Sequence, residues 1–79
     1  MMTQQIVDVC EDIQRGQEPF DRIMTAVADL GESEELVIVN IFEPVPLYGV
    51  LAQRGFVHET ARTPEGDWRV TFRRETPDR

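Results

Sequence analysis

Hydrophobic positions follow two different periods in the first half of the chain, and the change of period marks the predicted elements. Residues 6–10 are mostly β-branched, which is typical of a strand, and residues 36–42 are almost continuously apolar, as in a central strand covered on both faces. Between them, apolar residues recur at the spacing of one helical face: Phe20, Ile23, Met24, Val27 and Leu30. Pro19 is predicted to be the first residue of this helix, and Gly31 to end it in the left-handed conformation.

A second helix is predicted after the central strand. The run Glu43–Pro46 carries two prolines, which break a strand, and Pro46 is well placed to begin a helix. Gly55 is predicted to end this helix. The apolar residues of its predicted inner face are Leu47, Val50 and Leu51.

The last third of the chain predicts a β-hairpin. Residues 56–61 form its first strand, and residues 63–67 have the proline and glycine of a tight turn. In residues 68–73 apolar and charged positions alternate, so one face is apolar and the other is charged. The apolar positions are Trp68, Val70 and Phe72.

The element order strand–helix–strand–helix–strand–strand predicts an α/β (α+β) fold, a two-layer sandwich of two helices on a four-stranded sheet. Residues 1–79 make a single domain with a core over about residues 5–74 and short flexible ends. Right-handed crossovers place both helices on the same face of the sheet and leave the other face open.

An open sheet face exposes one side of the central strand, which is apolar on both sides. Either Leu36 and Ile38 or the set Val37, Val39 and Ile41 must point away from the helices. Two outcomes remain open at this point. The strip is covered by a homodimer or another protein partner, or the stems of Arg69 and Arg73 cover it.

Charge and composition limit the partners. The net charge is −7, all eight basic residues are arginine, and residues 1–50 alone have a balance of −8. Such an acidic small protein repels phosphate, so nucleic acid and anionic membranes are not expected partners. No long apolar run or signal-peptide pattern occurs, and a cytoplasmic location is expected by default.

The sequence lacks the residues that common catalytic sites need. Ser33 and His58 are the only serine and the only histidine, and the absence of lysine excludes Schiff-base chemistry and the phosphate-binding P-loop. No paired ligands at short spacing indicate a metal site. The sequence therefore predicts a protein that is not an enzyme, with no cofactor and no bound metal.

Cys10 is the one residue with intrinsic reactivity. It is placed at the end of the first predicted strand, and Glu11 and Asp12 follow it. These carboxylates are expected to raise the pKa of its thiol, so Cys10 is expected to be chemically quiet. The alternative is a reactive thiol that serves a sulfur-transfer or redox relay.

The run from Glu43 to Tyr48, with Arg54-Gly55-Phe56 and Gly66-Asp67-Trp68 downstream, resembles a small bacterial family of unknown function related to the TusA/SirA sulfur-carrier proteins. The opening Val7-Asp8-Val9-Cys10 is similar to the first strand of that family. The resemblance covers roughly residues 5–74. It implies a TusA/SirA-like sandwich with sheet order 1-2-4-3 and an antiparallel last strand.

In the sulfur carriers, a Cys-Pro-x-Pro motif begins the first helix, and its cysteine carries the persulfide. The equivalent stretch here is Gly16-Gln17-Glu18-Pro19, which keeps the second proline but has Gly16 in place of the cysteine. The resemblance thus implies the scaffold of a carrier without its sulfur-carrying atom.

The leading hypothesis is a small non-enzymatic binding module that acts through the surface around its helix N-termini or through its open sheet face. The candidate binding residues are Glu18, Pro19, Glu43, Pro44, Pro46 and Tyr48. Pro46 also has a structural explanation as a helix start, whereas Glu43 and Tyr48 have fewer structural duties. A relay through Cys10 and a homodimeric structural unit are the alternatives.

Overall fold

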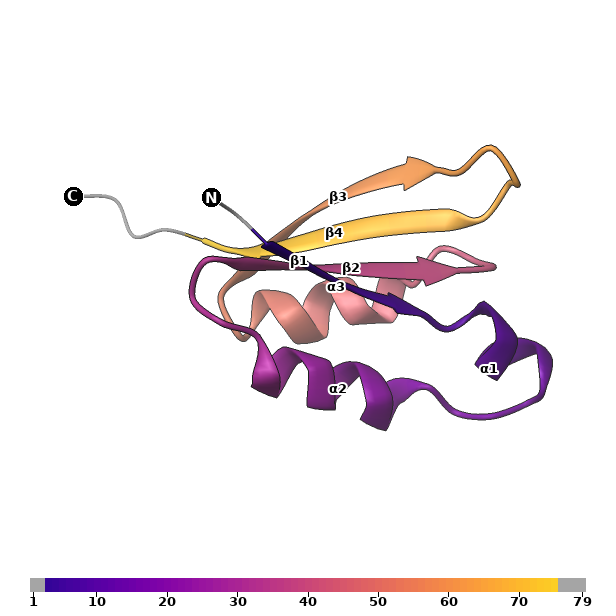
Figure 1. Ribbon diagram of the computed structural model, residues 1–79, viewed down its shortest axis with the longest axis horizontal. Coiled ribbons are helices and arrows are strands. Elements are labelled where there is room, and N and C mark those ends of the chain that lie inside the picture. Colours follow the sequence, from indigo (N-terminus) through magenta and orange to yellow (C-terminus); the bar gives the residue numbers. More distant parts are fainter. Residues whose placement is uncertain (1–2, 76–79) are drawn as a thin grey trace.

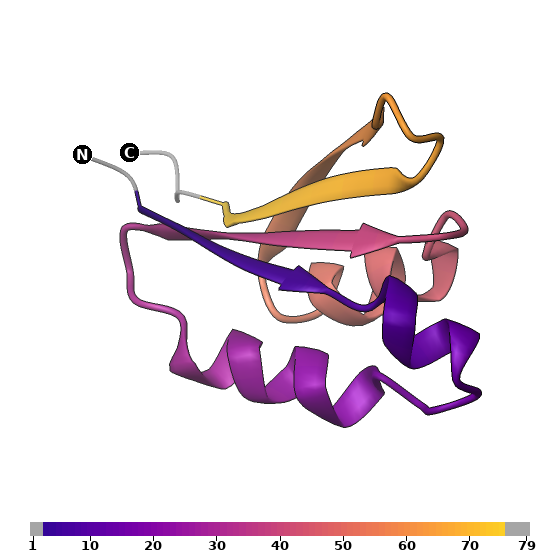
Figure 2. The same cartoon turned by 45° about the vertical axis from the view of Figure 1, so that its right-hand side comes forward.

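The computed structural model describes residues 3–75, which fold into two layers (Figure 1). The elements are β1 (Thr3–Asp8), α1 (Cys10–Gln14), α2 (Phe20–Asp29), β2 (Glu34–Asn40), α3 (Val45–Ala52), β3 (Phe56–Arg62) and β4 (Trp68–Arg74). The helices lie on one face of the sheet, and the other face is open (Figures 1 and 2).

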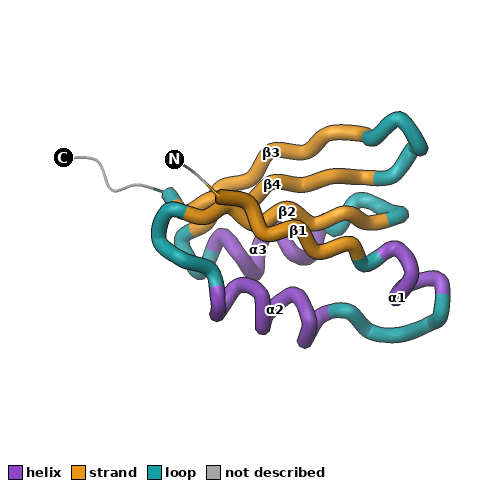
Figure 3. The backbone as a smooth tube through the Cα atoms, viewed as in Figure 1, coloured by secondary structure: helices purple, strands orange, loops and turns teal. Residues whose placement is uncertain are grey.

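The sheet has the strand order β1-β2-β4-β3 (Figure 3). β1 and β2 are parallel, and β4 runs antiparallel to both of its neighbours, β2 and β3. Both crossovers return on the helical side, as right-handed connections require. The predicted sandwich, its strand order and its antiparallel last strand are confirmed.

The core lies between β2 and the two longer helices. Leu36 and Ile38 point toward the helices and are fully buried, and Val70 and Phe72 of β4 continue the same layer. The helices contribute Ile23, Val27, Leu47 and Leu51. Burial of each such side chain is worth about 1.5–3 kcal/mol, so this single layer accounts for most of the drive to fold.

A short helix, α1, follows the first strand and is missing from the prediction. β1 ends at Asp8, and Cys10 begins the helix instead of ending a strand, because the Asp8 carboxylate accepts a hydrogen bond from the Cys10 amide at 3.0 Å. Glu11 and Arg15 form an ion pair at 3.5 Å along the helix, and Ile13 packs against the core. This stretch is mostly polar and only Ile13 points toward the core, so apolar spacing could not predict the helix.

The ends of the two longer helices differ from the prediction in detail. Pro19 is the N-cap of α2 and not its first residue, and Pro46 lies in the first turn of α3, which begins at Val45. Gly31 does not adopt the left-handed conformation, because α2 ends with Leu30 in an extended conformation. Gly55 does adopt it, with φ of 86°.

The open face carries the second apolar set of the central strand. Val37 and Val39 point away from the helices, and Ile41 lies beyond the end of β2. Val37 is only 3% exposed between its neighbours Ile6 and Thr71. Ile6, on the edge strand β1, is 66% exposed. The apolar strip of the open face is thus covered by neighbouring side chains at Val37 and exposed at Ile6 on the β1 edge. Pairing of this face with a second copy of the chain stays a prediction.

Arg74 ties the end of the sheet to the end of α2. Its guanidinium donates a hydrogen bond to the Leu30 carbonyl at 3.0 Å and lies 5.1 Å from the centre of the Phe56 ring. This contact satisfies one of the carbonyls that a helix C-terminus leaves without a partner.

We expect Arg74→Ala to lower the free energy of unfolding by about 1–2 kcal/mol, because it removes a charge-assisted hydrogen bond and the stacking on Phe56. Urea unfolding monitored by circular dichroism measures this. Arg73→Ala, on the exposed face of the same strand, is the matched control and should change the value by less than about 0.5 kcal/mol. Equal effects of the two variants would contradict this role of Arg74.

Candidate functional site

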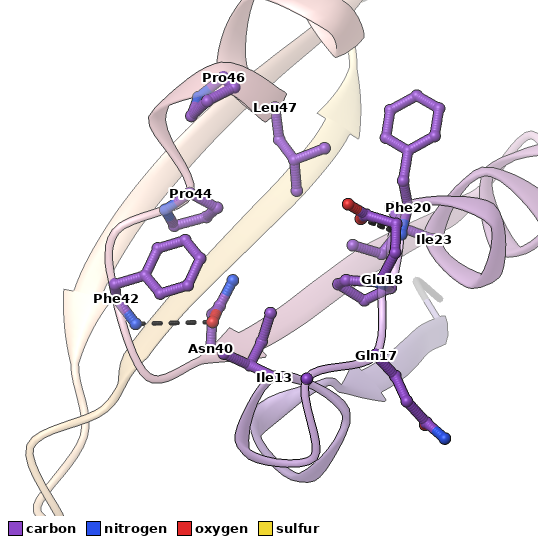
Figure 4. Close-up of a pocket in the computed structure, with 12 residues that line it drawn as sticks. Ile13, Gln17, Glu18, Phe20, Ile23, Asn40, Phe42, Pro44, Pro46 and Leu47 are labelled. Carbon is purple, nitrogen blue, oxygen red and sulfur yellow. Dashed lines mark hydrogen bonds between the residues drawn. The ribbon is translucent and has the colours of Figure 1, made fainter.

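A cavity of about 520 Å³ opens where the N-terminal ends of α2 and α3 meet the C-terminal end of β2 (Figure 4). It is lined by Ile13, Gly16, Gln17, Glu18, Pro19, Phe20, Ile23, Asn40, Phe42, Pro44, Pro46 and Leu47. Its volume lies within the range of small-ligand sites. Clefts beyond the carboxyl ends of parallel strands are the usual binding place in open α/β sheets, and β1 and β2 both end here.

The walls of the cavity are held by residues with restricted backbones. Pro19 and Pro44 are buried and cap the two helices, and Pro46 stiffens the first turn of α3. Gly16, with φ of 73°, turns the chain from α1 back toward α2. The cavity is therefore preformed by backbone constraints as well as by side-chain packing.

Asn40 is the polar group at the floor of the cavity. It is 3% exposed, and its Oδ1 accepts a hydrogen bond from the Ile41 amide at 2.7 Å, with the Phe42 amide at 3.5 Å. This contact fixes which end of the carboxamide is oxygen, so Nδ2 points into the cavity (Figure 4). Both hydrogen bonds of the Asn40 side chain within residues 3–75 use Oδ1, so Nδ2 has no protein acceptor there.

Glu18 is the charged residue of the lining, and it faces the Asn40 carboxamide across the cavity (Figure 4). Its Oε1 accepts a hydrogen bond from the Phe20 amide at 2.9 Å, which complements the positive end of the α2 dipole. The prolines of α3 also remove amide donors. Both features disfavour a bound anion, as the sequence predicts.

Two half-exposed aromatic rings flank the opening. Phe20 is 40% exposed on the α2 side, and Phe42 is 48% exposed on the β2 side. Ile41 and Val45 add further exposed apolar surface beside Phe42. Large exposed apolar side chains gathered around a cavity are typical of a binding surface.

The structure brings four of the six predicted binding residues together. Glu18, Pro19, Pro44 and Pro46 line the cavity. Glu43 and Tyr48, which the sequence favoured as functional residues, do not.

Glu43 and Tyr48 form a separate cluster with β3. The Tyr48 hydroxyl donates to Glu43 Oε2 at 3.0 Å and lies 2.8 Å from Thr60 Oγ1, from which it therefore accepts. Its ring stacks on His58 with 3.8 Å between centroids and 7° between planes. These contacts give Tyr48 a structural duty, since they join α3 to β3.

The sequence pattern did not identify the residues that supply the polar floor and part of the apolar wall of the cavity. Asn40 is the one polar residue inside the apolar run 36–42, and that interruption is a signal that could have identified it. Phe42 gave no signal, because an apolar residue at the end of a strand reads as core. Gln17 and Ile13 lie between the first predicted strand and Pro19, where the sequence predicted no helix or strand.

Cys10 lies outside the cavity and is half-buried. Burial raises the pKa of its thiol to about 12, with further contributions from a hydrogen bond to Asp8 and from the charges of Asp8 and Asp67. A thiol that stays protonated is a poor nucleophile. Among residues 3–75 no group of three or more His, Cys, Asp or Glu side chains could hold a metal ion.

At pH 7.5 we expect iodoacetamide to alkylate folded Cys10 at least about 30-fold more slowly than the urea-unfolded chain. A pKa of about 12 cuts the thiolate fraction about 1,000-fold, and the higher intrinsic reactivity of a more basic thiolate recovers about 30-fold of it. Intact-mass spectrometry over time measures both rates. The double variant Cys10→Ser/Ser33→Cys supplies an exposed control thiol. Equal alkylation rates for Cys10 in the folded and unfolded chain would contradict this expectation and support a reactive thiol at Cys10.

Burial raises the pKa of Tyr48; the Thr60 hydrogen bond acts against this rise, and Glu43 adds to it. Because Tyr48 is the only tyrosine, absorbance at 295 nm reports its ionisation alone. We expect the midpoint above pH 10 and a lower midpoint in Glu43→Gln, whereas Glu18→Gln leaves it unchanged. An equal titration midpoint of Tyr48 in the wild type and in Glu43→Gln would contradict the hydrogen bond between these two side chains.

Comparison with known proteins yields one match. The family described as uncharacterized conserved protein (DUF2249) matches residues 6–74. No curated protein and no solved structure matches the chain. In the described part of the chain no helix is both long and apolar enough to cross a membrane.

Proposed function

The chain belongs to the DUF2249 family of uncharacterized conserved proteins, and we propose that it is a small non-enzymatic binding module whose site is the cavity between α2 and α3. The cavity offers an amide donor, a carboxylate and a large apolar wall. These groups hold a ligand, and they include no nucleophile paired with a base, which covalent catalysis needs.

One observation carries this proposal: the buried residue Asn40 directs an amide donor into an apolar cavity, and that donor makes no hydrogen bond to residues 3–75. Asn40 Nδ2 keeps access to water only through the cavity. A ligand that brings an acceptor replaces that water and gains the apolar contact of Phe20 and Phe42 at the same time.

The proposed relation to the sulfur carriers agrees with this location. Gly16, the position that the resemblance equates with the persulfide-carrying cysteine, lines the cavity, so under this relation a ligand would sit where a carrier presents its sulfur. The left-handed conformation at Gly16 is strained for any residue with a side chain. This backbone supports a binding role over a relay that has merely lost its thiol, and the raised pKa of Cys10 favours the same choice.

A homodimer through the open sheet face is a second candidate, and the exposure of Ile6 favours it. The burial of Val37 leaves less uncovered apolar area on that face than the sequence suggested. The cavity is therefore the better-supported site.

The test is a screen of small apolar, cationic, anionic and neutral fragments at millimolar concentration, read by ¹H–¹⁵N correlation spectra of the labelled protein. We expect the amide shifts of bound fragments to cluster on Gln17, Phe20 and Phe42. Phe42→Ala should weaken those fragments at least about fivefold, because it removes a half-exposed wall of the cavity.

Ile6→Ala is the matched control, since it removes an even more exposed apolar side chain from the open face. It should leave fragment binding unchanged. Binders that map to the open sheet face, or a complete absence of binders at the cavity, would overturn the proposed function.

A further inference from the structure

Building on the proposed function, we infer that the ligand is a segment of a partner protein in which an apolar side chain is followed by a basic one. Three features of the cavity select this chemistry. They are its local charge, the free donor of Asn40, and the apolar walls between Asn40 and Glu18.

The lining of the cavity has a negative charge, which comes from Glu18. Every lining residue belongs to the first fifty residues, which have a balance of −8, and Glu18 is the charged member of the lining. Both arginines of that half are engaged with acids: Arg22 lies 2.9 Å from Asp12, and Arg15 lies 3.5 Å from Glu11. A cationic group on the ligand therefore meets no competing basic residue of this half.

The Asn40 amide needs an acceptor. Its Nδ2 is the free donor at the cavity floor, because its Oδ1 is committed to the Ile41 amide at 2.7 Å. A peptide carbonyl is a suitable partner, since it is an uncharged acceptor that Glu18 does not repel.

The apolar wall lies between these two polar groups. Figure 4 shows Leu47 beside the space between the Asn40 carboxamide and the Glu18 carboxylate, whereas Pro44 and Phe42 lie on the other side of Asn40 and extend the apolar wall there. A short peptide segment carries a backbone carbonyl, an apolar side chain and a long basic side chain within a few ångströms of one another, so one segment can supply all three groups. An anionic ligand would face Glu18, so it is disfavoured.

Three capped tetrapeptides that differ in one side chain test the inference: acetyl-Gly-Leu-Arg-Gly-amide and the same peptide with Gln or Glu in place of Arg. Dissociation constants come from titrations of the full chain followed by ¹H–¹⁵N spectra at low salt. We expect the Arg peptide to bind two- to fivefold more tightly than the Gln peptide, the range that an exposed ion pair supplies, and the Glu peptide to bind most weakly.

Two variants assign the effect to their residues. Glu18→Gln should abolish the preference for Arg over Gln, whereas Glu32→Gln, which removes the same charge from the exposed turn after α2, should keep it. Asn40→Asp keeps an oxygen for the Ile41 amide and loses the donor, so it should weaken the neutral Gln peptide at least threefold. If Asn40→Asp does not fold, the comparison of Glu18→Gln with Glu32→Gln still decides the question.

The outcomes separate the two proposals. Equal binding of the Arg and Glu peptides at the cavity overturns the basic-segment inference and leaves the cavity as the binding site. Fragment binding at the cavity without peptide binding does the same. Cavity shifts that depend on protein concentration without any peptide would identify a second copy as the occupant and overturn the inference. Failure of both peptides and fragments at the cavity overturns the proposed function as well.

Discussion

The structure depends on the burial of β2 from two sides. Leu36 and Ile38 lie under the helices without exposed area, and Val37 is almost as well covered on the opposite face. A strand apolar on both sides must be central, so it pairs with β1 on one edge and β4 on the other. Two crossovers of the same hand then place α2 and α3 on one face, and their N-terminal ends meet beyond the end of β2.

The end of β2 is therefore also where the candidate site forms. The strand ends at Asn40, whose side-chain oxygen takes over the amide of Ile41 as the chain turns. That arrangement uses the acceptor half of the carboxamide and leaves the donor half facing the cavity. The prolines that follow stop the strand and start α3 without supplying amide donors. The hydrogen bond that ends β2 at Asn40 therefore leaves the Asn40 Nδ2 donor facing the apolar cavity without a protein acceptor.

Much of the fold follows from local patterns, whereas the site does not. Apolar spacing located α2, and alternation at Trp68, Val70 and Phe72 located the hairpin, since both are repeated signals. The helix α1 escaped prediction because only Ile13 points inward in a polar stretch. The lining joins segments as distant as Gly16 and Pro46, and burial of Asn40 depends on packing that no single stretch encodes. Glu43 and Tyr48 were selected because the sequence assigned them few structural duties, yet Tyr48 packs against β3 and donates a hydrogen bond to Glu43.

The most direct test of the account concerns the side-chain amide of Asn40. It is the only asparagine of the chain, so its two amide protons can be assigned without ambiguity. In a sample saturated with the leucine–arginine peptide, the account predicts nuclear Overhauser contacts between these protons and the peptide. A bound peptide with contacts to other parts of the surface and none to the Asn40 amide would contradict it.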